Sequence, residues 1–526
     1  MAEYHVENFG CRASRSDGDA IAANLRRHGL NPAENSGSAH VVIVNTCSVT
    51  AEADRQARAF VRRVRRQNPD ARIVVTGCYA QRAPQELAAL PEVDAVIGNS
   101  HKSMVADVAL DLANKIGLPR STATKDPALV TASEAINPTP AFVPLATILH
   151  DDAFAHSELA ALPFAPDAQQ TRPNLKVQDG CGNRCSFCII PTTRGPSRSV
   201  PLATSLDNVR RYVDQGGMEL VLSGINLGRW GRDLEPALRF EDLVAAILTD
   251  TSLPRLRLSS IEPMDWSPDL LAIYREFATE ESSFPRFPVP RSVSPAFHPR
   301  LARHAHLPLQ SGSDTILRRM YRRYRPWHYA ERLAQIRALL PDAAIGADVM
   351  IGFPGETDAL FQESYDFIAA QPFTYLHLFP FSARPATPAW ELNRQNPIPA
   401  PAVHERMAAL RSLIAEKFRV FRSQFLGGTL SAVTLGDAHS GQRAPAATEA
   451  VTDNFLKLTL ARTGAAVHSN RLITARITAL TAEGLEGTPI DSQTIRPEIR
   501  RFEGAGLHRA TGETGIIEGA RLPAVP

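Results

Sequence analysis

Apolar and polar residues alternate along the N-terminal part of the chain in the pattern of strand–helix repeats. Residues 41–44 form a continuous apolar run typical of a buried parallel strand, and residues 72–76 form another. Between them, residues 51–67 place apolar side chains at helical spacing until Pro69 ends the pattern. This alternation predicts a small doubly wound parallel sheet with right-handed crossovers over residues 1–120.

A second strand–helix alternation begins near residue 175. Six short apolar segments predict strands at residues 175–178, 219–222, 256–259, 305–309, 345–351 and 375–379. Six parallel strands separated by helices are typical of a complete or partial α/β barrel, which we assign to residues 171–400. Prolines cluster at residues 281–300, where we expect an exposed insertion between two repeats.

The C-terminal part changes from helical to period-two patterning. Residues 401–426 have the pattern of an amphipathic helix, and short alternating segments after it predict a small β-barrel over residues 427–488. Residues 121–170 are rich in proline and read as a linker or insertion. Residues 489–526 read as a weakly ordered tail. The predicted fold class is therefore α/β multidomain: a doubly wound sheet domain, a partial (β/α)6 barrel and a C-terminal β-barrel.

Composition places the chain among ordinary globular proteins. The 526 residues are 44% hydrophobic and 21% charged, and this length predicts several domains. The start has no basic segment followed by an apolar run, and no stretch reaches the ~18 apolar residues of a membrane helix. We therefore expect a cytoplasmic protein without a membrane partner, whose six cysteines stay reduced. The net charge of +2 means that any nucleic-acid site must come from local clustering.

Three cysteines stand close together directly after the first predicted barrel strand. Cys181, Cys185 and Cys188 have the spacing C-x3-C-x2-C, from which three thiolates can converge on one object. Zinc sites favour four ligands and C-x2-C pairs, whereas a four-iron cluster held by three cysteines leaves one iron open. Because barrels keep their chemistry at the carboxyl ends of their strands, this spacing predicts an iron–sulfur site. The alternative is a group of buried structural cysteines.

The other three cysteines are far apart in sequence. Cys11, Cys47 and Cys78 are separated by 36 and 31 residues, about one strand–helix unit each, and each follows a predicted strand. Parallel strands bring their carboxyl ends to one edge of a sheet, so we expect these thiols to meet. On their own they could equally be core cysteines. Beside the first group, a second cluster site becomes the better interpretation, and it uses all six cysteines.

Several segments resemble a known family. QDGCGNRCSFCIIPTTRGPSRS is similar to the radical SAM signature of the methylthiotransferases. FGCRASRSDGDA, VNTCSVTAEAD and TGCYAQRAPQEL resemble the three N-terminal cysteine segments of that family, and LSGINLG, LRLSSIEP, HLPLQSGSD and GADVMIGFPGET resemble its barrel segments in order. The resemblance covers about residues 3–100, 171–280 and 300–425, and more weakly the β module as a TRAM-type domain. It is strongest to the branch that modifies N6-threonylcarbamoyladenosine beside the anticodon of tRNA.

This resemblance implies an activity and its cofactors. It implies two 4Fe-4S clusters, one on each group of three cysteines, with S-adenosylmethionine chelated by the cluster on Cys181, Cys185 and Cys188. Two S-adenosylmethionine molecules would be used to place a methylthio group on C2 of the adenine, the hard chemistry belonging to the cofactors. The implied partners are tRNA, an electron donor such as a flavodoxin or ferredoxin, and a sulfur donor.

Further candidate residues lie at the ends of predicted barrel strands. By position and resemblance, the candidates for cofactor binding are Phe187, Ser223, Gly224, Glu262, Gln310, Asp348 and Gly352. Phe187 could instead be a core aromatic. The polar residues could instead cap helices.

Two arginine clusters are candidates for RNA contact. One lies on a single face of the predicted helix at 51–67, opposite its apolar stripe: Arg55, Arg58, Arg62, Arg65 and Arg66. Such a stripe is usually a solvated face, but no acidic residue interrupts it, so contact with tRNA phosphates is a reasonable hypothesis. The other cluster, Arg318, Arg322 and Arg323, is interleaved with tyrosines, which suits unpaired bases.

Two alternative functions remain open. A non-enzymatic RNA-binding protein with two structural zinc sites would use the same cysteines. A family member acting on isopentenyladenosine in tRNA or on a ribosomal protein side chain would share both clusters. The segments RGPSRS, LSSIEP and HLPLQSGSDTILRRMYRRY favour the threonylcarbamoyl branch by resemblance.

Overall fold

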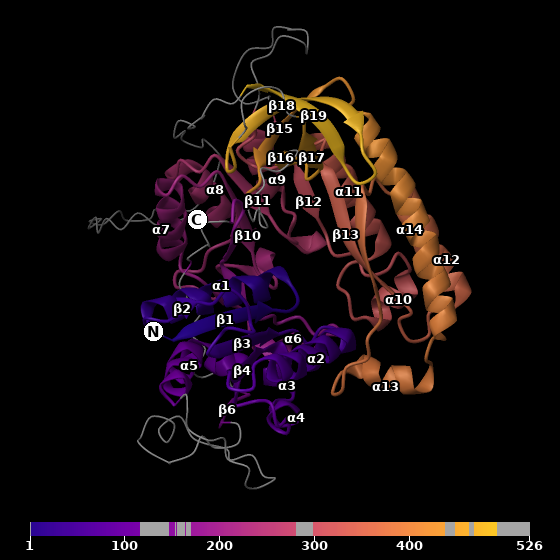
Figure 1. Ribbon diagram of the computed structural model, residues 1–526. Coiled ribbons are helices and arrows are strands. Elements are labelled where there is room, and N and C mark those ends of the chain that lie inside the picture. The colour runs from indigo at the N-terminus through magenta and orange to yellow at the C-terminus, as the bar shows by residue number, and fades with distance from the viewer. Residues whose placement is uncertain are drawn as a thin grey trace, which may run out of the picture.

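The computed structural model describes residues 2–115, 147–152, 154, 164, 170–279, 298–436, 448–461 and 468–491. Most of the predicted linker and proline-rich insertion, and nearly all of the predicted tail, lie outside the described residues. Among the described residues, no helix is long and apolar enough to cross a membrane. The N-terminal α/β domain and the C-terminal β-barrel lie at opposite ends of the central barrel (Figure 1).

The N-terminal domain is built on a six-stranded parallel sheet with the strand order β2-β1-β3-β4-β5-β6. The strands are β1 (Glu3–Asn8), β2 (Asn31–Pro32), β3 (Val41–Thr46), β4 (Arg72–Gly77), β5 (Ala95–Gly98) and β6 (Thr147–Leu149). Residues 147–149 fall in the predicted linker, but they form the sixth strand, because Ile148 and Leu149 bury their side chains beside β5.

Helices cover both faces of this sheet, so the predicted doubly wound architecture is confirmed. The helices are α1 (Arg12–Arg27), α2 (Ala51–Gln67), α3 (Cys78–Arg82), α4 (Pro84–Ala88), the 3-10 helix η1 (Asn99–Met104) and α5 (Val105–Asn114). Ile21 and Leu25 of α1 pack on the face that α5 also covers. Phe60 and Val64 of α2 pack on the other face with α3 and α4. The central strands β3, β4 and β5 are therefore buried on both sides, as the continuous apolar runs of β3 and β4 predict.

The central domain has six parallel strands in two sheets, β11-β10-β7 and β12-β13-β14. They are β7 (Asn174–Lys176), β10 (Glu219–Ser223), β11 (Arg255–Leu258), β12 (His304–His306), β13 (Ala344–Ile351) and β14 (Tyr375–Pro380). The two sheets meet where the backbone N–H of Ile261 donates to His306 O at 3.0 Å. The result is an open, partial barrel, as predicted.

Helices pack on the outside of the six strands, and two short strands pair at the mouth of the barrel. The helices are α6 (Ile190–Arg194), α7 (Leu202–Asp214), η2 (Leu227–Arg229), α8 (Phe240–Asp250), η3 (Pro263–Asp265), α9 (Pro268–Ala278), α10 (Asp314–Arg319), α11 (Pro326–Leu339), α12 (Asp358–Ala370) and α13 (Pro388–Gln395). The short strands are β8 (Gln178–Asp179) and β9 (Arg198–Ser199). Side chains that cap helix starts help to set these boundaries: Ser267 Oγ accepts from Leu270 N at 3.1 Å at the start of α9.

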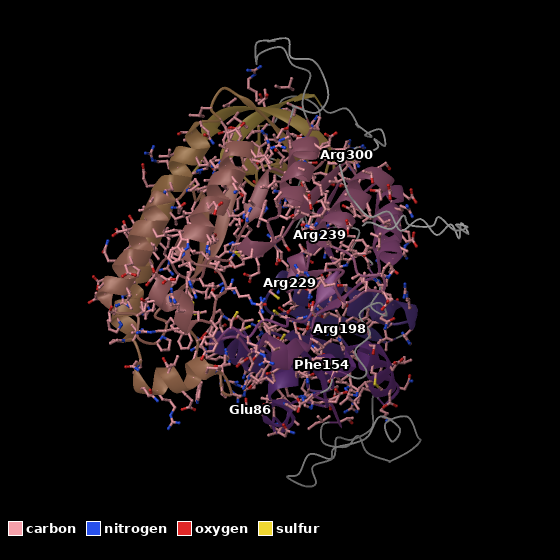
Figure 2. The ribbon with its side chains drawn as sticks, turned by 180° about the vertical axis from the view of Figure 1, so that it is seen from behind. Glu86, Phe154, Arg198, Arg229, Arg239 and Arg300 are labelled. Carbon is pink, nitrogen blue, oxygen red and sulfur yellow. The ribbon has the colours of Figure 1, made fainter. Side chains whose placement is uncertain are left out.

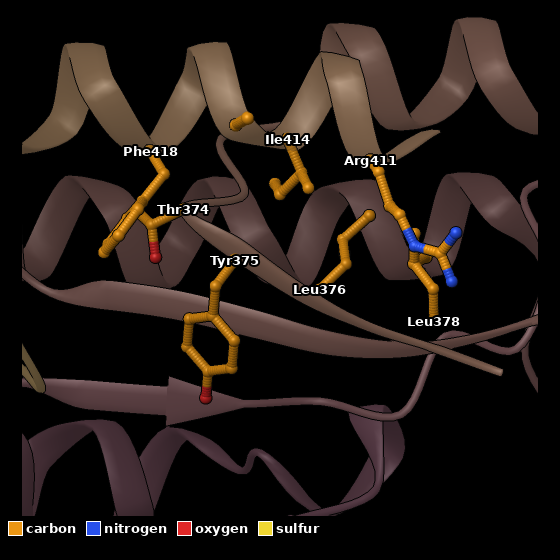
Figure 3. Close-up of a pocket in the computed structure, with 8 residues that line it drawn as sticks. Thr374, Tyr375, Leu376, Leu378, Arg411, Ile414 and Phe418 are labelled. Carbon is orange, nitrogen blue, oxygen red and sulfur yellow. The ribbon is translucent and has the colours of Figure 1, made fainter. Parts of the chain in front are cut away.

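The long helix α14 (Ala400–Ser423) runs beside β14 (Figure 1) and leaves a groove of about 340 Å³ between them. Side chains of β14 alternate between two faces. Figure 3 shows Leu376 pointing toward α14 and the ring of Tyr375 pointing away from it. The alternation therefore separates a helix-facing layer of β14 from a layer that faces the barrel interior.

The C-terminal module is a closed five-stranded barrel in the order β15-β16-β17-β19-β18, as predicted. Its strands are β15 (Thr429–Thr434), β16 (Thr448–Thr452), β17 (Lys457–Leu460), β18 (Leu472–Leu480) and β19 (Leu485–Asp491). Arg257 of β11 donates to Thr452 O at 2.9 Å and to Asp453 O at 3.0 Å. Arg303, just before β12, pairs with the Asp453 carboxylate at 2.5 Å. These bonds hold the module against the end of the central barrel that lies farthest from the N-terminal domain.

Candidate active site

The first cysteine trio (Cys181, Cys185 and Cys188) lies in the loop between β8 and α6 at the mouth of the barrel. Neighbouring N–H groups point at two of its sulfur atoms. Asn226 Nδ2 lies 3.5 Å from Cys181 Sγ, and an Arg322 guanidinium nitrogen lies 3.4 Å from Cys185 Sγ. Hydrogen bonds and positive charge of this kind favour the thiolate over the thiol, which is the form that binds iron.

Burial has the opposite effect on the same trio. It raises the pKa of the Cys188 thiol to about 12 and also raises the pKa of Cys181. Thiolates in such a place need a nearby positive charge, and a metal cluster supplies it because coordination deprotonates the thiol. The donor set and its surroundings therefore fit an iron–sulfur cluster.

The second cysteine trio (Cys11, Cys47 and Cys78) lies at the carboxyl edge of the N-terminal sheet. Cys11 precedes α1, Cys47 follows β3, and Cys78 is the first residue of α3 after β4. The ends of β1 and β3 approach closely, because a Cβ on Gly10 (φ +103°) would lie 2.7 Å from Cys47 Sγ. Burial, followed by the neighbouring thiols Cys78 and Cys11, raises the pKa of Cys47 to about 12. The sheet thus brings these three thiols into one neighbourhood.

The spacing of the sulfur atoms argues against a single zinc ion. In the described part of the chain, the only three His, Cys, Asp or Glu ligand atoms within 4.8 Å of one another belong to His306, Asp348 and His377. Two thiolates on one zinc, each about 2.3 Å from the ion, cannot stand more than about 4.6 Å apart. Thiolates on separate irons of a cluster stand farther apart. Both trios therefore suit a cluster better than the zinc alternative.

A buried network of charges joins the two domains between the trios. Asp17 of α1 pairs with Lys102 at 2.6 Å and with Arg194 at 3.1 Å, and it also contacts Lys176. Asp179 pairs with Arg194 at 3.0 Å and with Lys176 at 2.9 Å. Burial raises the pKa of Asp17, but Lys102, Lys176 and Arg194 outweigh it and lower the pKa to about 2. Both acids are therefore ionised, and Asp17 is satisfied by cations of both domains.

Hydrogen bonds link the surroundings of one trio to those of the other. Asn99 Nδ2 donates to Thr193 O of α6 at 2.7 Å and lies 3.5 Å from Cys78 Sγ. The same junction includes Phe154 and Arg198, both labelled in Figure 2, with the guanidinium carbon 5.6 Å from the ring centroid. The two trios therefore belong to one domain junction.

A cavity of about 190 Å³ opens beside Cys188 between the two domains. Val49 and Thr50 line it from the N-terminal domain, and Phe187 and Gln310 line it from the barrel. Gln310 has a φ of +68°, and its buried Oε1 has no hydrogen-bond partner among the described residues. Such a buried acceptor aimed at a cavity suits a polar group of a bound molecule. The predicted residues Phe187 and Gln310 therefore line one cavity.

Three other predicted cofactor-binding residues lie around the mouth of the barrel. Ser223 Oγ is buried and donates to Leu175 O at 3.4 Å. A Cβ on Gly224 would lie 3.0 Å from Gln178 Oε1, so this glycine permits a close approach of the β8 strand. Glu262 is held by Arg322 at 2.5 Å.

Asp348 lies on β13 and Gly352 directly follows that strand, and the two residues face different surroundings. Gly352 has a φ of +78°, and a Cβ there would meet the Val403 side chain of α14 at 2.6 Å. A glycine is therefore required here by helix packing, and its predicted place in the cofactor site stays a prediction. Asp348 faces the barrel interior, where His377 donates to it at 3.2 Å.

Two of the arginines predicted to contact RNA have partners within the protein. Arg65 donates to Ala71 O and Glu92 O, each at 2.8 Å, and pairs with Asp94. Arg322 is buried between Glu262 and the first trio. A helical wheel shows which face an arginine occupies but not the loop carbonyls that reach it.

The other arginines that were predicted to contact RNA are more exposed to solvent. Arg58 is half-buried and donates to Tyr79 Oη at 2.5 Å. The exposed ones are Arg55, Arg62 and Arg66 on α2, and Arg318 and Arg323 after the barrel's fourth strand. Arg55 and Arg318 also form surface ion pairs within their own helices.

Sequence reasoning missed the polar residues that surround the thiols. Asn99 follows β5 directly, and Asn226 stands three residues after β10, so the rule that located the cysteines could have found both. The partners of Asp17 and Arg194 come from five separate elements, and no local sequence pattern predicts that they form ion pairs.

Comparison with known proteins identifies the family. The model of the Uncharacterized protein family UPF0004 matches residues 3–98. The chain is 31% identical to the threonylcarbamoyladenosine tRNA methylthiotransferase MtaB of Bacillus subtilis, over 87% of this chain and 90% of that relative. It is also 31% identical to the tRNA-2-methylthio-N(6)-dimethylallyladenosine synthase of Acidothermus cellulolyticus, over 78% of this chain and 73% of that relative.

Among solved structures, the chain resembles the radical S-adenosylmethionine methyltransferase TsrM from Kitasatospora setae. The TM-score is 0.49 at 15% identity, covering 75% of this chain and 78% of that one. The match to the two enzymes above extends over most of each chain. The protein therefore belongs to the radical SAM methylthiotransferase family, enzymes that transfer a sulfur-containing group.

Proposed function

We propose that this enzyme places a methylthio group on C2 of N6-threonylcarbamoyladenosine, beside the anticodon of tRNA. It would use two four-iron clusters and two molecules of S-adenosylmethionine. The observation that carries the proposal is the meeting of two cysteine trios at one domain junction, with a cavity beside Cys188 that both domains line. The relatives whose names specify tRNA methylthiolation support the substrate class.

The chemistry explains why two clusters are needed. C2 of adenine carries no acidic proton, so a general base cannot activate this carbon by deprotonating it. When bound, the clusters and S-adenosylmethionine supply the one-electron chemistry and the sulfur that replace the C2–H bond by a C2–S bond. In this proposal the first trio holds the cluster that binds S-adenosylmethionine, and the second trio holds the cluster that carries the sulfur.

Residues of this chain position the proposed clusters and join the two domains around them. Asn226 and Arg322 hydrogen-bond to sulfur atoms of the first trio, and Asn99 does the same for the second. Such bonds set the potential of a bound cluster as well as its position. The Asp17–Arg194 pair joins the two domains that carry the trios.

RNA would approach across exposed cationic surface. Arg62 and Arg66 on the outer face of α2 suit phosphate contacts, and Arg323 with exposed Tyr321 suits an unpaired base. The closed β module is a candidate TRAM-type RNA contact. An electron donor such as a flavodoxin or ferredoxin and a separate sulfur donor complete the proposed system.

The test is an anaerobic reaction of the reconstituted enzyme with defined substrates. We expect the methylthio product from an anticodon stem-loop RNA that carries threonylcarbamoyladenosine, detected by mass spectrometry of its nucleosides. Parallel reactions use the same RNA with isopentenyladenosine, and ribosomal protein. Product formed only on one of these alternatives, or zinc in place of iron after purification, would contradict the proposal.

A further inference from the structure

Three side chains on neighbouring strands of the central barrel form a group of possible metal ligands apart from the cysteines. We define this group, His306, Asp348 and His377, as the polar layer. His306 ends β12, Asp348 lies on β13, and His377 stands opposite Asp348 on β14 in the parallel register. One ligand atom of each residue lies within 4.8 Å of those of the other two, which holds for no other such group in the described part of the chain. The paired strands therefore hold three potential ligands close together.

The distances within the polar layer suit a single tetrahedral ion. Asp348 Oδ1 lies 3.2 Å from His377 Nδ1 and 3.5 Å from His306 Nε2. Two ligand atoms that are each about 2.1 Å from a zinc ion, at a tetrahedral angle, stand about 3.4 Å apart. Both measured distances agree with this separation to about 0.2 Å. Two edges of a zinc coordination shell are thus already formed by these side chains.

His306 brings an unsatisfied nitrogen atom to this group. The residue is only 4% exposed, and its Nε2 has no hydrogen-bond partner among the described residues. The separation of 3.5 Å between this nitrogen and Asp348 Oδ1 is longer than a normal N–H···O hydrogen bond. Because a buried polar atom without a partner is unfavourable, the position calls for a further group. A cation between the nitrogen and the carboxylate would satisfy both.

The ring of His306 is held in one orientation by its neighbours. Its Nδ1 contacts Ser260 Oγ at 2.7 Å, and the ring of Tyr375 stacks on it with a centroid distance of 5.8 Å. When Ser260 Oγ accepts from Nδ1–H, Nε2 carries the lone pair that a metal ion needs. Metal-binding histidines are commonly oriented in this way through their second ring nitrogen. Ser260 therefore supplies the supporting contact of a metal site.

The polar layer is open to solvent and separate from the cavity beside Cys188. The side chains of His377 and Asp348 are 57% and 26% exposed, so an ion and a further ligand can reach them. Met350 and Phe379, which line the cavity, stand opposite each other two residues farther along the same strands. Because a strand rises about 3.3 Å per residue, the two positions are about 7 Å apart.

The donor atoms decide which cation fits. Two imidazole nitrogens and one carboxylate oxygen suit zinc, whereas magnesium and calcium prefer oxygen ligands. Iron(II) accepts the same donors, but ligands at right angles around a six-coordinate ion of similar radius would stand about 3.0 Å apart, closer than both measured distances. The spacing therefore favours zinc.

We propose that the polar layer binds one zinc ion through His306 Nε2, Asp348 Oδ1 and His377 Nδ1. The fourth position takes water or an oxygen atom of a ligand, because three protein ligands and one open position are typical of zinc sites that interact with small molecules. This site is additional to the two cysteine trios and to the proposed methylthio transfer.

The test counts zinc in the full-length protein after both trios have been loaded with iron and sulfide. The reconstituted protein is dialysed anaerobically against a zinc salt, and bound zinc is measured by mass spectrometry of the metals. We expect about one zinc ion per chain, and zinc X-ray absorption should show nitrogen and oxygen ligands at about 2.0–2.2 Å. Zinc on residual free cysteines would instead show sulfur at about 2.3 Å.

Three variants locate the zinc ion. His377→Ala removes a ligand from an exposed position and should raise the Kd for zinc by more than about a hundredfold, beyond the usual effect of losing a supporting contact. Ser260→Ala keeps all three ligands and should raise the Kd by about ten- to hundredfold. His404→Ala removes an exposed histidine of α14 and should leave the Kd unchanged. Kd is measured by competition with a chelator, and an unchanged iron content shows that each variant is folded.

The zinc and iron counts separate the two proposals. Wild-type protein without bound zinc, a zinc spectrum with sulfur ligands, or an unchanged Kd in both His377→Ala and Ser260→Ala would overturn the zinc site. Each of these results leaves the proposed function standing, because that proposal is judged by the iron of the two trios and by the methylthio product.

Discussion

The two cysteine trios differ in how the chain assembles them. The first trio comes from a single loop between β8 and α6, so its three thiols stay together whenever that loop is formed. The second trio is spread over three strand–helix units and meets only because β1, β3 and β4 pair in register. A local site can be recognised from spacing alone, whereas an assembled site depends on the stability of a whole sheet.

The largest expected effect separates the chemistry of the two trios. Cys185→Ala should abolish both cleavage of S-adenosylmethionine and formation of the methylthio product, because it removes a ligand of the cluster proposed to bind the cofactor. Cys47→Ala should abolish the product but retain cleavage. Deoxyadenosine and the methylthio nucleoside are measured in the same reaction. Loss of cleavage in Cys47→Ala, at intact iron content of the first trio, would contradict the division of roles.

The charge network between the trios should affect both together. Arg194→Met leaves Asp17 and Asp179 buried with fewer partners, and breaking such a pair typically costs about 3–5 kcal/mol. Denaturant unfolding measures the loss. Arg210→Met, which removes an exposed ion pair with Asp207, should change stability by less than about 1 kcal/mol. Equal effects of the two substitutions would show that the network does not join the domains.

The same network predicts a dependence of stability on pH. The cations around Asp17 outweigh its burial and lower its pKa from 3.8 to about 2, so its ionised form stabilises the folded state. This contribution is fully present above about pH 4 and is lost as the pH falls through 2, and it amounts to about 2 kcal/mol. The stability difference between wild type and Asp17→Asn should therefore shrink over this range. A difference that stays constant down to pH 2 would contradict the ion pairing.

The smallest effect concerns the outer face of the domain that holds the second trio. Arg62→Glu and Arg66→Glu should weaken tRNA binding, and removing two phosphate contacts should reduce the slope of log K against log salt by about 2. Arg65→Glu should instead destabilise the domain, because Arg65 ties α2 to Asp94 and to loop carbonyls. Filter binding across salt concentrations distinguishes these results. An unchanged slope for the Arg62 and Arg66 variants would mean that these two arginines are ordinary surface residues that do not contact phosphates.

Sequence pattern was sufficient for the architecture because it depends on repeated, local signals. The runs at 41–44 and 72–76 became β3 and β4, and the period-two segments became the closed C-terminal barrel. Pattern failed for β6, since a strand of three residues beside a proline-rich stretch carries too little periodicity. It also could not show that helix packing requires a glycine at Gly352, because the helix that carries Val403 begins almost fifty residues later.

The positions of site residues were predictable only where their side chains extend from the carboxyl ends of parallel strands. That rule located both trios and Gln310, whose side chains extend from the carboxyl ends of strands. It could not show that Arg322 is buried against Cys185, or that Arg194 of the barrel pairs with Asp17 of the N-terminal domain. Such contacts join residues that lie far apart in the sequence, and only tertiary packing creates them.

The iron content of the reconstituted protein tests the central claim most directly. Wild type should hold about eight irons per chain, and triple alanine variants of the first trio or of the second should each hold about four, since each trio is proposed to carry a four-iron unit. About four irons in the wild type, or an equal loss of all iron from both variants, would contradict the presence of two independent cluster sites.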